Sequence, residues 1–292
     1  MTGQQFSSGA LGPPAGRPII RVVNLVKRFD GRAVLNGVSL DIFPGETMVI
    51  LGGSGCGKST LLRHMVALTW PDEGHVELFG RNLSEASDDE LDELRKRFGV
   101  LFQSSALFNS MTVGQNVALP LQEHSELDPD TIDIMVRIKL EQVGLRPAID
   151  RMPSMISGGM KKRAALARAI ALDPEILFYD EPSAGLDPVT LAEIDQLILD
   201  LTRKLGVTSV VVTHEMDSAF RIADRLAVLD SGRVLKVGRR EEFQAIRDGA
   251  PTGREDTDLI RQFLRGDSEG PITRRRLSTD YEQDILEAAG GP

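Results

Sequence analysis

The sequence of 292 residues lacks the features that mark secreted and membrane-spanning chains. Its single cysteine cannot form a disulfide within the chain, which fits a reducing compartment without requiring one. No run of about 18 predominantly apolar residues is present, so no segment is expected to span a bilayer. The residues before Arg17 carry neither a charge nor an apolar core, unlike a secretory signal. We therefore expect a soluble protein of the cytosol.

Basic side chains are in deficit as well. The chain has 34 Lys and Arg against 43 Asp and Glu, a formal charge of −9, which disfavours nonspecific binding to nucleic acid. Aromatic residues make up only 5%, but apolar residues as a whole reach 41% and charged residues 26%, as in ordinary globular proteins. This composition supports a sizeable core and excludes a mainly disordered chain.

Beyond a leader, the chain alternates between two kinds of pattern. Residues 1–18 are half Gly, Pro and Ser and are typical of a flexible leader. Short apolar runs rich in β-branched residues predict strands at 19–26, 38–42, 47–51, 76–79, 100–102, 176–180, 209–213, 226–229 and 234–237. Helical patterns lie at 58–69, 131–143, 160–172, 189–205 and 215–223. Because strands alternate with helices, we predict an α/β fold with a mainly parallel sheet.

A glycine-rich segment joins the predicted strand 47–51 to the predicted helix 58–69. It reads Gly52-Gly53-Ser54-Gly55-Cys56-Gly57-Lys58-Ser59, followed by Thr60, and matches the P-loop pattern in the strand-to-helix context that supports it. Its glycines let backbone N–H groups turn towards phosphate oxygens, and the helix N-terminus adds partial positive charge. We expect Lys58 to bridge the β- and γ-phosphates of ATP and the Ser59 hydroxyl to coordinate Mg²⁺. For Cys56, a small filler is favoured over a redox role.

Two carboxylates follow the apolar run 176–180. The run is apolar at its odd and its even positions until its last residue, as expected of a strand buried on both faces. Asp180 and Glu181 then stand at the carboxyl end of the sheet, where such folds bind ligands. We expect Asp180 to hold Mg²⁺, through water, and Glu181 to accept a proton from, or orient, the water that attacks the γ-phosphate. The alternative is a pair of carboxylates that caps the following turn.

The run Ile156-Ser157-Gly158-Gly159-Met160-Lys161 resembles the signature motif of ATP-binding-cassette (ABC) ATPases. Its serine and glycines open the predicted helix 160–172 and offer free N–H groups and a hydroxyl to an anion. In this family the loop binds the γ-phosphate held by the other subunit of a dimer. The resemblance implies that Ser157, Gly158 and Gly159 contact the ATP of a second copy, in an ATP-sandwiched homodimer. A simple helix N-cap is the other interpretation.

Four further residues stand in the order that the ABC family has them. Phe29 resembles the aromatic that stacks on adenine, although a core phenylalanine is a rival interpretation. Gln103 matches the Q-loop glutamine, which contacts Mg²⁺ and the attacking water and senses the membrane partner. Asp187 ends a segment that resembles the D-loop, which joins the two sites. His214 matches the switch histidine that contacts the γ-phosphate.

The resemblance, over about residues 19–245, implies an ABC-type P-loop fold. Its parts are a RecA-like, mainly parallel sheet, an N-terminal antiparallel β subdomain, and an α-helical signature subdomain over about 104–168. ABC proteins of DNA repair and chromosome maintenance insert long coiled coils between Gln103 and Ser157, but only 53 residues lie there, without sustained heptads. Translation-type proteins carry two cassettes per chain, and this chain has one P-loop. A transporter ATPase is therefore the favoured class.

The string ISGGMKKRAALARA at 156–169, together with the segment 101–113, is similar to the ATPases of Mla phospholipid transporters, within the group that serves MCE-protein systems. Met160 stands where the ABC family usually has glutamine, so phosphate recognition would rest on Ser157 and the glycine N–H groups. The similarity implies phospholipid transport between the inner and outer membranes of a Gram-negative envelope. It implies an integral membrane permease, a periplasmic MCE protein and a small STAS-domain protein as partners. An ATPase of another importer, such as one for polar amino acids, is the alternative.

The 25 residues from Phe98 to Gln122 carry no charge, whereas the segment 85–93 before them holds six acidic residues and is typical of a solvated helix face. Transporter ATPases form the groove for a cytoplasmic coupling helix in this uncharged region. We expect a permease to dock there, and packing of the helical subdomain is the alternative, which can hold in part. The side chains concerned are Leu107, Phe108, Met111 and Val113.

The tail of residues 246–292 is the least informative segment. Apolar residues at helical spacing within 258–264 predict a short helix that docks on its own or on the partner subunit. Residues 281–289 are a weaker helix candidate. The basic run 274–276 fits a solvated tail better than a contact with anionic lipid.

Overall fold

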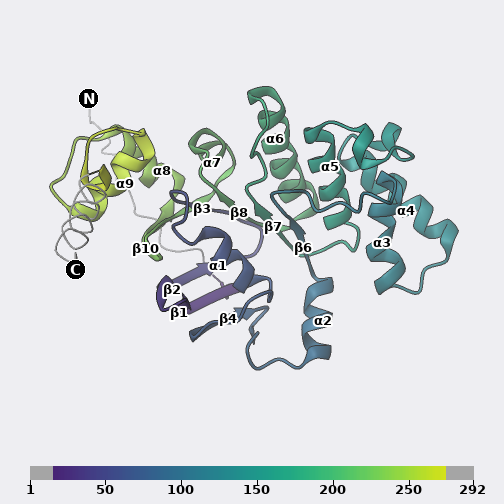
Figure 1. The fold of residues 1–292 in the computed structure, drawn as a ribbon, viewed down its shortest axis with the longest axis horizontal. Coiled ribbons are helices and arrows are strands. Elements are labelled where there is room, and N and C mark those ends of the chain that lie inside the picture. Colours follow the sequence, from purple (N-terminus) through teal and green to yellow (C-terminus); the bar gives the residue numbers. More distant parts are fainter. Residues whose placement is uncertain (1–15, 274–292) are drawn as a thin grey trace, which may run out of the picture.

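The computed structural model describes residues 16–273, which form two sheets surrounded by helices (Figure 1). Most of the predicted leader lies outside the described residues, and so do the basic run 274–276 and the helix candidate 281–289. Within residues 16–273, no helix is long and apolar enough to cross a membrane.

The central sheet has six strands in the order β10-β9-β3-β8-β7-β6. Neighbouring strands run parallel except β9 and β10, which are antiparallel because only a tight turn at Ser231-Gly232 connects them. The prediction of a mainly parallel sheet is confirmed. The strands are β3 (Thr47–Leu51), β6 (Phe98–Leu101), β7 (Ile176–Asp180), β8 (Thr208–Thr213), β9 (Arg225–Asp230) and β10 (Arg233–Arg239).

The two faces of this sheet carry different helices. In β3, Met48 and Ile50 belong to one core cluster while Val49 and Leu51 belong to the other, as the period of two in a strand requires. Helix α1 (Lys58–Met65) packs into the first cluster. Helices α5 (Gly158–Ala169) and α6 (Pro188–Leu205) pack into the second. The helices that begin at the P-loop and at the signature therefore lie on opposite faces of the sheet.

A smaller antiparallel sheet, β2-β1-β4-β5, completes the core around α1, and Figure 1 shows it below the central sheet. The sequence indicated only the apolar parts of its first two strands. In the structure both strands continue through polar residues to a hairpin at Phe29 and Arg32, because ladder hydrogen bonds extend them beyond their buried part. The strands are β1 (Ile20–Phe29), β2 (Arg32–Ile42), β4 (Glu73–Leu78) and β5 (Arg81–Asn82).

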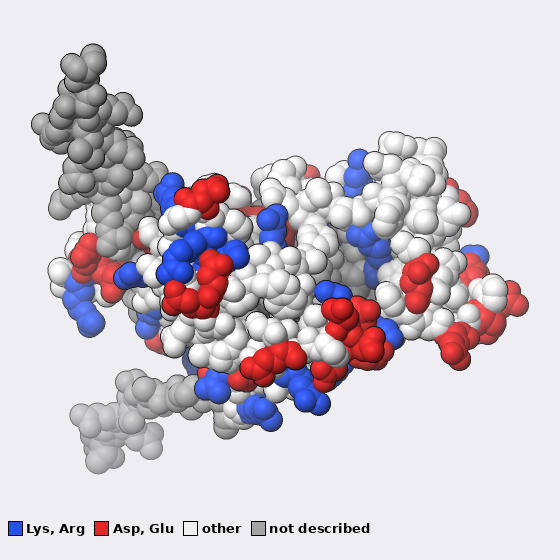
Figure 2. Space-filling view, turned by 60° about the horizontal axis from the view of Figure 1, so that its bottom comes forward, with Lys and Arg blue, Asp and Glu red and all other residues white. Residues whose placement is uncertain are grey.

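The acidic run forms helix α2 (Asp88–Lys96), with Ser87 and Glu90 in a capping box. Acidic residues in its first turn favour the helix N-terminus. Further along, Asp92 and Glu93 pair with Arg95 and Lys96 of the same helix. Figure 2 brings this lower part of the molecule forward and shows acidic and basic side chains side by side. The predicted solvated helix face is confirmed.

The helical subdomain contains α3 (Val113–His124), α4 (Pro129–Gln142) and α5, which lie together at one end of Figure 1. Helix α3 was not expected, because Gly114 and Asn116 stand among its buried residues and Pro120 lies inside it, which obscures the helical periodicity. It begins at a capping box between Thr112 and Gln115. Two short 3₁₀ helices, Arg146–Ala148 and Pro153–Met155, lead from α4 to α5.

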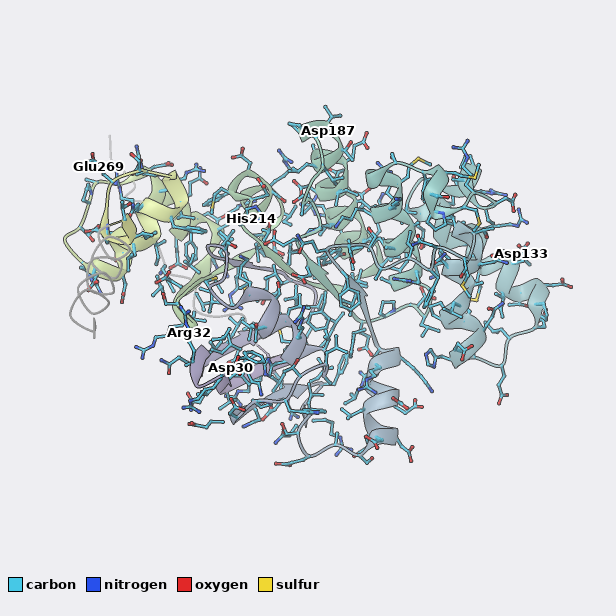
Figure 3. All side chains as sticks on the ribbon, in the orientation of Figure 1. Asp30, Arg32, Asp133, Asp187, His214 and Glu269 are labelled. Atoms are coloured by element: carbon cyan, nitrogen blue, oxygen red, sulfur yellow. The ribbon has the colours of Figure 1, made fainter. Side chains whose placement is uncertain are left out.

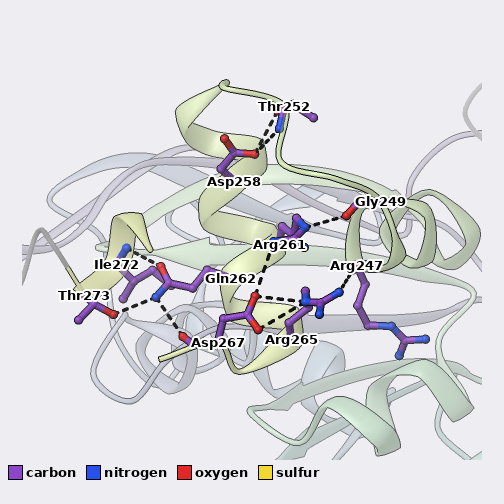
Figure 4. A network of polar contacts seen from close by, with 10 residues as sticks. All are labelled: Arg247, Gly249, Thr252, Asp258, Arg261, Gln262, Arg265, Asp267, Ile272 and Thr273. Atoms are coloured by element: carbon purple, nitrogen blue, oxygen red, sulfur yellow. Dashed lines mark hydrogen bonds and ion pairs between the residues drawn. The ribbon is translucent and has the colours of Figure 1, made fainter. Parts of the chain in front are cut away.

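The C-terminal part of the described chain contains α7 (Met216–Ile222), α8 (Arg240–Asp248) and α9 (Glu255–Arg265). The helix predicted within 258–264 is present as α9, and its Leu259, Ile260 and Leu264 are buried against their own chain. Polar contacts reinforce this docking (Figure 4): the Arg261 side chain donates to the Gly249 carbonyl at 2.8 Å. Of the two docking alternatives, the one on its own subunit is the arrangement in this structure.

Candidate functional site

The register of the parallel strands brings three functional segments to one edge of the sheet. Leu51 pairs with Thr213, and Asp180 pairs with Val212. The P-loop, Glu181 and His214 each follow directly after these residues, so they leave the sheet at the same carboxyl edge. Figure 3 labels His214 at this edge and Asp187 farther out, before α6.

Two glycines of the P-loop lie so close to neighbouring main chain that a side chain would not fit there. Gly57 has φ 108°, and a Cβ there would lie 2.8 Å from the Val34 carbonyl oxygen. A Cβ on Gly52 would lie 2.4 Å from the Leu229 carbonyl oxygen. Cys56 is buried, and burial raises the pKa of its thiol. A protonated, buried thiol supports the filler role.

Lys58 is folded back onto the P-loop. Its ammonium donates to the carbonyl oxygens of Gly52 at 2.9 Å and Gly53 at 3.1 Å, and lies 3.6 Å from Oε1 of Glu181. The side chain is buried, so these oxygens supply the acceptors that a buried ammonium requires. A phosphate brought into this loop offers stronger, charged acceptors to the same ammonium.

Ser59 and Asp180 meet directly across the site, since the Ser59 hydroxyl donates to Oδ1 of Asp180 at 2.9 Å. A hydroxyl beside a carboxylate is an oxygen donor set that suits Mg²⁺, which usually completes its shell with phosphate oxygens and water. Among residues 16–273, no group of three His, Cys, Asp or Glu side chains is placed to hold a metal by itself. The Ser59 hydroxyl and the Asp180 carboxylate fit Mg²⁺ bound together with a nucleotide. Thr60 follows in the first turn of α1.

Glu181 is the most constrained residue of the site. It is buried and adopts a left-handed backbone with φ 47°, while its N–H donates to the Val212 carbonyl at 2.9 Å. Its Oε2 lies 2.9 Å from Nδ1 of His214, whose side chain is half exposed. The carboxylate is therefore oriented from two sides, by His214 and by Lys58. A buried, oriented carboxylate at this edge has the placement that proton abstraction from water requires.

The signature segment lies next to the D-loop. Ser157 caps α5 by accepting a hydrogen bond from the Met160 N–H at 3.3 Å. Asp187 caps α6 by accepting from the N–H groups of Val189 and Thr190. Ser157 and Gly158 are exposed, whereas Gly159 is buried against Thr190. Helix α5, which begins at the signature, and helix α1, which begins at the P-loop, lie on opposite faces of the sheet.

Two predicted site residues lie at the margins of this cluster. Gln103 follows β6 with its side chain exposed, and its main-chain carbonyl accepts a hydrogen bond from Lys162. Phe29 is 48% exposed at the β1–β2 hairpin, which makes the core-phenylalanine alternative wrong. Its hairpin partner Arg32 lines a pocket of about 620 Å³ that is also lined by P-loop residues 53–56. The Phe29 ring is exposed and is therefore free to stack on a base.

The proposed docking residues divide into two groups. Phe108 is half exposed and Met111 is partly exposed, so both can contact a partner. Val113 is fully buried and Leu107 packs against the same core, so these two stabilise the helical subdomain instead. The docking interpretation is therefore wrong for Val113, because that residue begins α3 inside the core.

Sequence reasoning missed two basic residues that contact the site from α5. Lys162 is 4% exposed, and Arg168 donates to the carbonyls of Ser105 and Ala106 beyond Gln103. The available signal was a run of basic residues within an alanine-rich helix. A charged residue on the buried face of such a helix needs acceptors from elsewhere in the fold.

Comparison with known proteins shows which family this chain resembles in sequence. Residues 35–184 match the family model described as ABC transporter. The intermembrane phospholipid transport system ATP-binding protein MlaF of Escherichia coli K12 is 41% identical, with 91% of this chain and 97% of that protein covered. MlaF of Haemophilus influenzae is 38% identical, with 92% and 98% covered. The probable ribonucleotide transport ATP-binding protein mkl of Mycobacterium leprae is 41% identical, with 93% and 76% covered.

Solved ABC cassettes share the fold. The cassette MJ0796, in a dimeric post-hydrolysis state bound to ADP and Pi, matches with a TM-score of 0.70 and 31% identity, over 76% of this chain and 98% of that one. The protein cbiO1 from Clostridium perfringens, part of the transporter complex cbiONQ, matches with a TM-score of 0.73 and 32% identity, over 80% and 94%. The predicted P-loop fold is confirmed.

Proposed function

This chain belongs to the ABC transporter family and is an ATPase; from that premise we propose that it powers phospholipid transport between the inner and outer membranes of a Gram-negative envelope. The observation that carries the proposal is its similarity to MlaF of two organisms over nearly the full length of both chains. A fold-level match alone would not indicate a cargo, because one fold serves many functions.

In the proposed reaction, the P-loop receives the phosphates of ATP on its inward-facing N–H groups and on the N-terminus of α1. Lys58 exchanges the Gly52 and Gly53 carbonyls for the β- and γ-phosphates. Its contact with Glu181 is then lost, and the Glu181 carboxylate can bind water instead. Ser59 and Asp180 would hold Mg²⁺, together with the side chain of Gln103. When bound, this ion neutralises negative charge on the phosphate oxygens.

Glu181 then accepts a proton from the attacking water. Nδ1 of His214 holds the Glu181 carboxylate in place by its contact with Oε2. The other ring nitrogen of His214, Nε2, contacts the γ-phosphate. Phe29 stacks on the adenine. Ser157, Gly158 and Gly159 complete the γ-phosphate site of a second copy, and Asp187 reaches across the dimer axis. The separation of α1 and α5 by the sheet supports this division between two copies.

We place the working protein at the cytoplasmic face of the inner membrane, held there by an MlaE-like integral membrane permease. An MlaD-like periplasmic MCE protein and an MlaB-like STAS-domain protein complete the proposed complex, and no nucleic acid takes part. Phe108 is the best docking candidate, because it is a large apolar side chain left half exposed in the uncharged stretch. A phenylalanine in that position can line the groove that receives a cytoplasmic coupling helix of the permease.

The cargo is tested by purifying the chain from its native membranes and identifying its companions. We expect a permease bound to an MCE protein, and ATP-dependent movement of labelled phospholipid by the complex in reconstituted vesicles. Co-purification of a periplasmic solute-binding protein would overturn the lipid assignment. Another importer with a polar cargo, such as an amino acid, is the second candidate, and the similarity to mkl, a probable ribonucleotide transport protein, favours keeping it in the assay.

The docking surface is tested by placing a charge on Phe108. We expect Phe108→Glu to reduce the permease recovered with the chain by about tenfold, because a buried, unpaired carboxylate opposes docking. Ile134→Glu is the matched control, since Ile134 is a similarly exposed apolar residue of the same subdomain but lies on α4. Equal recovery from the two variants would show that Phe108 is not the contact.

A further inference from the structure

Lys162 is a buried cation that joins two functional loops. It stands on α5, five residues after Ser157, with a side chain that is 4% exposed. Its ammonium donates to the main-chain carbonyl of Gln103 and lies 3.4 Å from that of Glu181. Burial lowers the pKa of Lys162, and the charges of Asp180 and Glu181 oppose this shift.

The backbone that Lys162 contacts is conformationally strained. Glu181 is left-handed, with φ 47°, although it is not a glycine. Ser105 and Ala106, just beyond Gln103, are also left-handed, with φ 64° and 46°. Such conformations persist only where the surroundings hold them. Arg168 holds the second pair, donating to the Ala106 carbonyl at 2.8 Å and to the Ser105 carbonyl at 3.1 Å.

One rigid helix therefore reaches both loops. The loops follow β6 and β7, which are neighbouring parallel strands with Leu101 opposite Tyr179. Helix α5 lies close against β6, since a Cβ on Gly99 would come within 2.1 Å of the Ala169 carbonyl oxygen. The same helix begins at the exposed Ser157. A displacement of the signature end of α5 thus moves Lys162, and with it the main chain at Gln103 and Glu181.

We propose that Lys162 is a positioning residue, which ties the carbonyls of Gln103 and Glu181 to α5 so that the Glu181 carboxylate is aligned for hydrolysis only when the signature helix is in place. The proposal rests on the proposed role of Glu181 in hydrolysis. It makes the placement of the carboxylate in one ATP site depend on the helix that contributes the signature to the other site. A lysine that only stabilises the helical subdomain would have no such effect on turnover.

The test compares variants of the full chain within its purified membrane complex. Lys162→Met keeps an unbranched side chain of similar length but removes the ammonium, which is the hydrogen-bond donor. We expect its kcat for ATP to fall about 10- to 100-fold, because small displacements of a catalytic group cost this much. We expect its KM for ATP to stay within about threefold, because the P-loop is untouched. Lys162→Arg, which retains charge and donors, should recover kcat to within about fivefold of the unmodified complex.

Two further variants separate positioning from stability. Lys139 is equally buried, on α4, and pairs with Asp173 away from the site. Lys139→Met should therefore leave kcat per folded molecule unchanged. Arg168→Met releases only the segment after Gln103 and not Glu181, so its loss of kcat should be smaller than that of Lys162→Met. Titration with a fluorescent ATP analogue gives the number of competent sites, to which every kcat is normalised.

The outcomes divide cleanly. A normalised kcat of Lys162→Met within about threefold of the unmodified complex overturns the proposal. The proposal is also overturned if Lys139→Met loses as much normalised kcat as Lys162→Met, or if the normalised kcat of Lys162→Arg is no higher than that of Lys162→Met. If Lys162→Met does not fold, Lys162→Gln replaces it, since Gln keeps a donor without the charge. Its normalised kcat should then lie below that of Lys162→Arg, and equal values overturn the proposal. The cargo assignment fails separately, by absence of phospholipid movement in the unmodified complex.

Discussion

The two parts of the nucleotide machinery differ in how their polar atoms are satisfied. On the P-loop side, Lys58 and Glu181 contact each other, Ser59 contacts Asp180, and His214 contacts Glu181. On the signature side, Ser157 and Asp187 bind only the first turn of the helix that each one caps. The first cluster is largely buried, whereas Ser157, Gly158 and Asp187 are exposed.

This difference indicates a division of labour. The P-loop side holds the proposed base, a cation and the proposed metal-binding pair in mutual contact, as the proposed hydrolysis requires. The signature side presents free N–H groups and a hydroxyl at a helix N-terminus, with the rest of its own site on the far face of the sheet. A surface of this kind suits the proposed recognition of an anion that another copy holds. Lys162 is the contact that joins the two sides.

The strongest way to break the comparison is to remove the proposed base. We expect Glu181→Gln to lower kcat by about 10²- to 10⁴-fold, because an amide cannot take up the proton of the attacking water. ATP binding should persist, because the P-loop keeps its N–H groups and Lys58. Phosphate release per nucleotide site measures the first effect, and titration with a fluorescent ATP analogue measures the second. A variant that kept more than a tenth of the turnover would place the chemistry elsewhere.

Two adjacent glycines sharpen the comparison on the signature side. A Cβ on Gly159 would lie 2.5 Å from Cγ2 of Thr190, whose hydroxyl bonds Asp187. Gly159→Ala should therefore lower the free energy of unfolding by about 1–3 kcal/mol, because Thr190 must move and its bond to Asp187 weakens. A Cβ on Gly158 would meet Leu186 at 3.8 Å, an ordinary contact.

Gly158→Ala is thus the matched control, with stability no lower than that of the unmodified chain. Urea unfolding of the two variants measures the difference. If both variants lost the same stability, the packing of the signature against the D-loop would not distinguish the two positions. If Gly158→Ala lost turnover without losing stability, the exposed glycine would act on the nucleotide of the partner copy, as the comparison requires.

The sequence predicted those parts of the site whose signals are contiguous. The P-loop and the pair Asp180 and Glu181 each combine a buried strand with the functional residues that follow it, so one pattern indicates both structure and place. The mainly parallel sheet follows for the same reason. Helix α3 escaped prediction because its buried and its exposed residues both come from the uncharged stretch. The contrast between charged and apolar positions that indicates a helix face is therefore missing.

The contacts made by Lys162 and Arg168 could not be predicted from sequence. Both residues stand in a helix whose alanines suit either face, so the pattern does not indicate which side is buried. Their acceptors are main-chain carbonyls, which every residue has and which leave no mark in a sequence. Only the fold shows that α5 passes beside the left-handed residues after β6 and β7. The proximity of Gly159 to Thr190 is hidden for the same reason.

A pH titration extends the comparison to the two helices. The P-loop helix α1 buries His64, whose Nδ1 lies 2.7 Å from the Thr60 carbonyl oxygen, whereas the signature helix α5 has no histidine. Burial lowers the pKa of His64 below the usual 6.5, and the Thr60 carbonyl opposes this only in part. Between the lowered pKa and 6.5, the unfolded chain takes up a proton that the folded chain refuses.

The free energy of unfolding should therefore fall as the pH drops through this window, by at most about 1.4 kcal/mol per pH unit from this group. Urea unfolding between pH 7.5 and 5.0 measures the slope. His64→Leu should flatten it, and His124→Leu should not, because His124 is exposed. Amide exchange, corrected for its intrinsic pH dependence, should show α1 losing protection on acidification before α5 does. An unchanged slope in His64→Leu would mean that the pKa of His64 is the same in the folded and unfolded chains, and that acid sensitivity does not distinguish the P-loop side from the signature side.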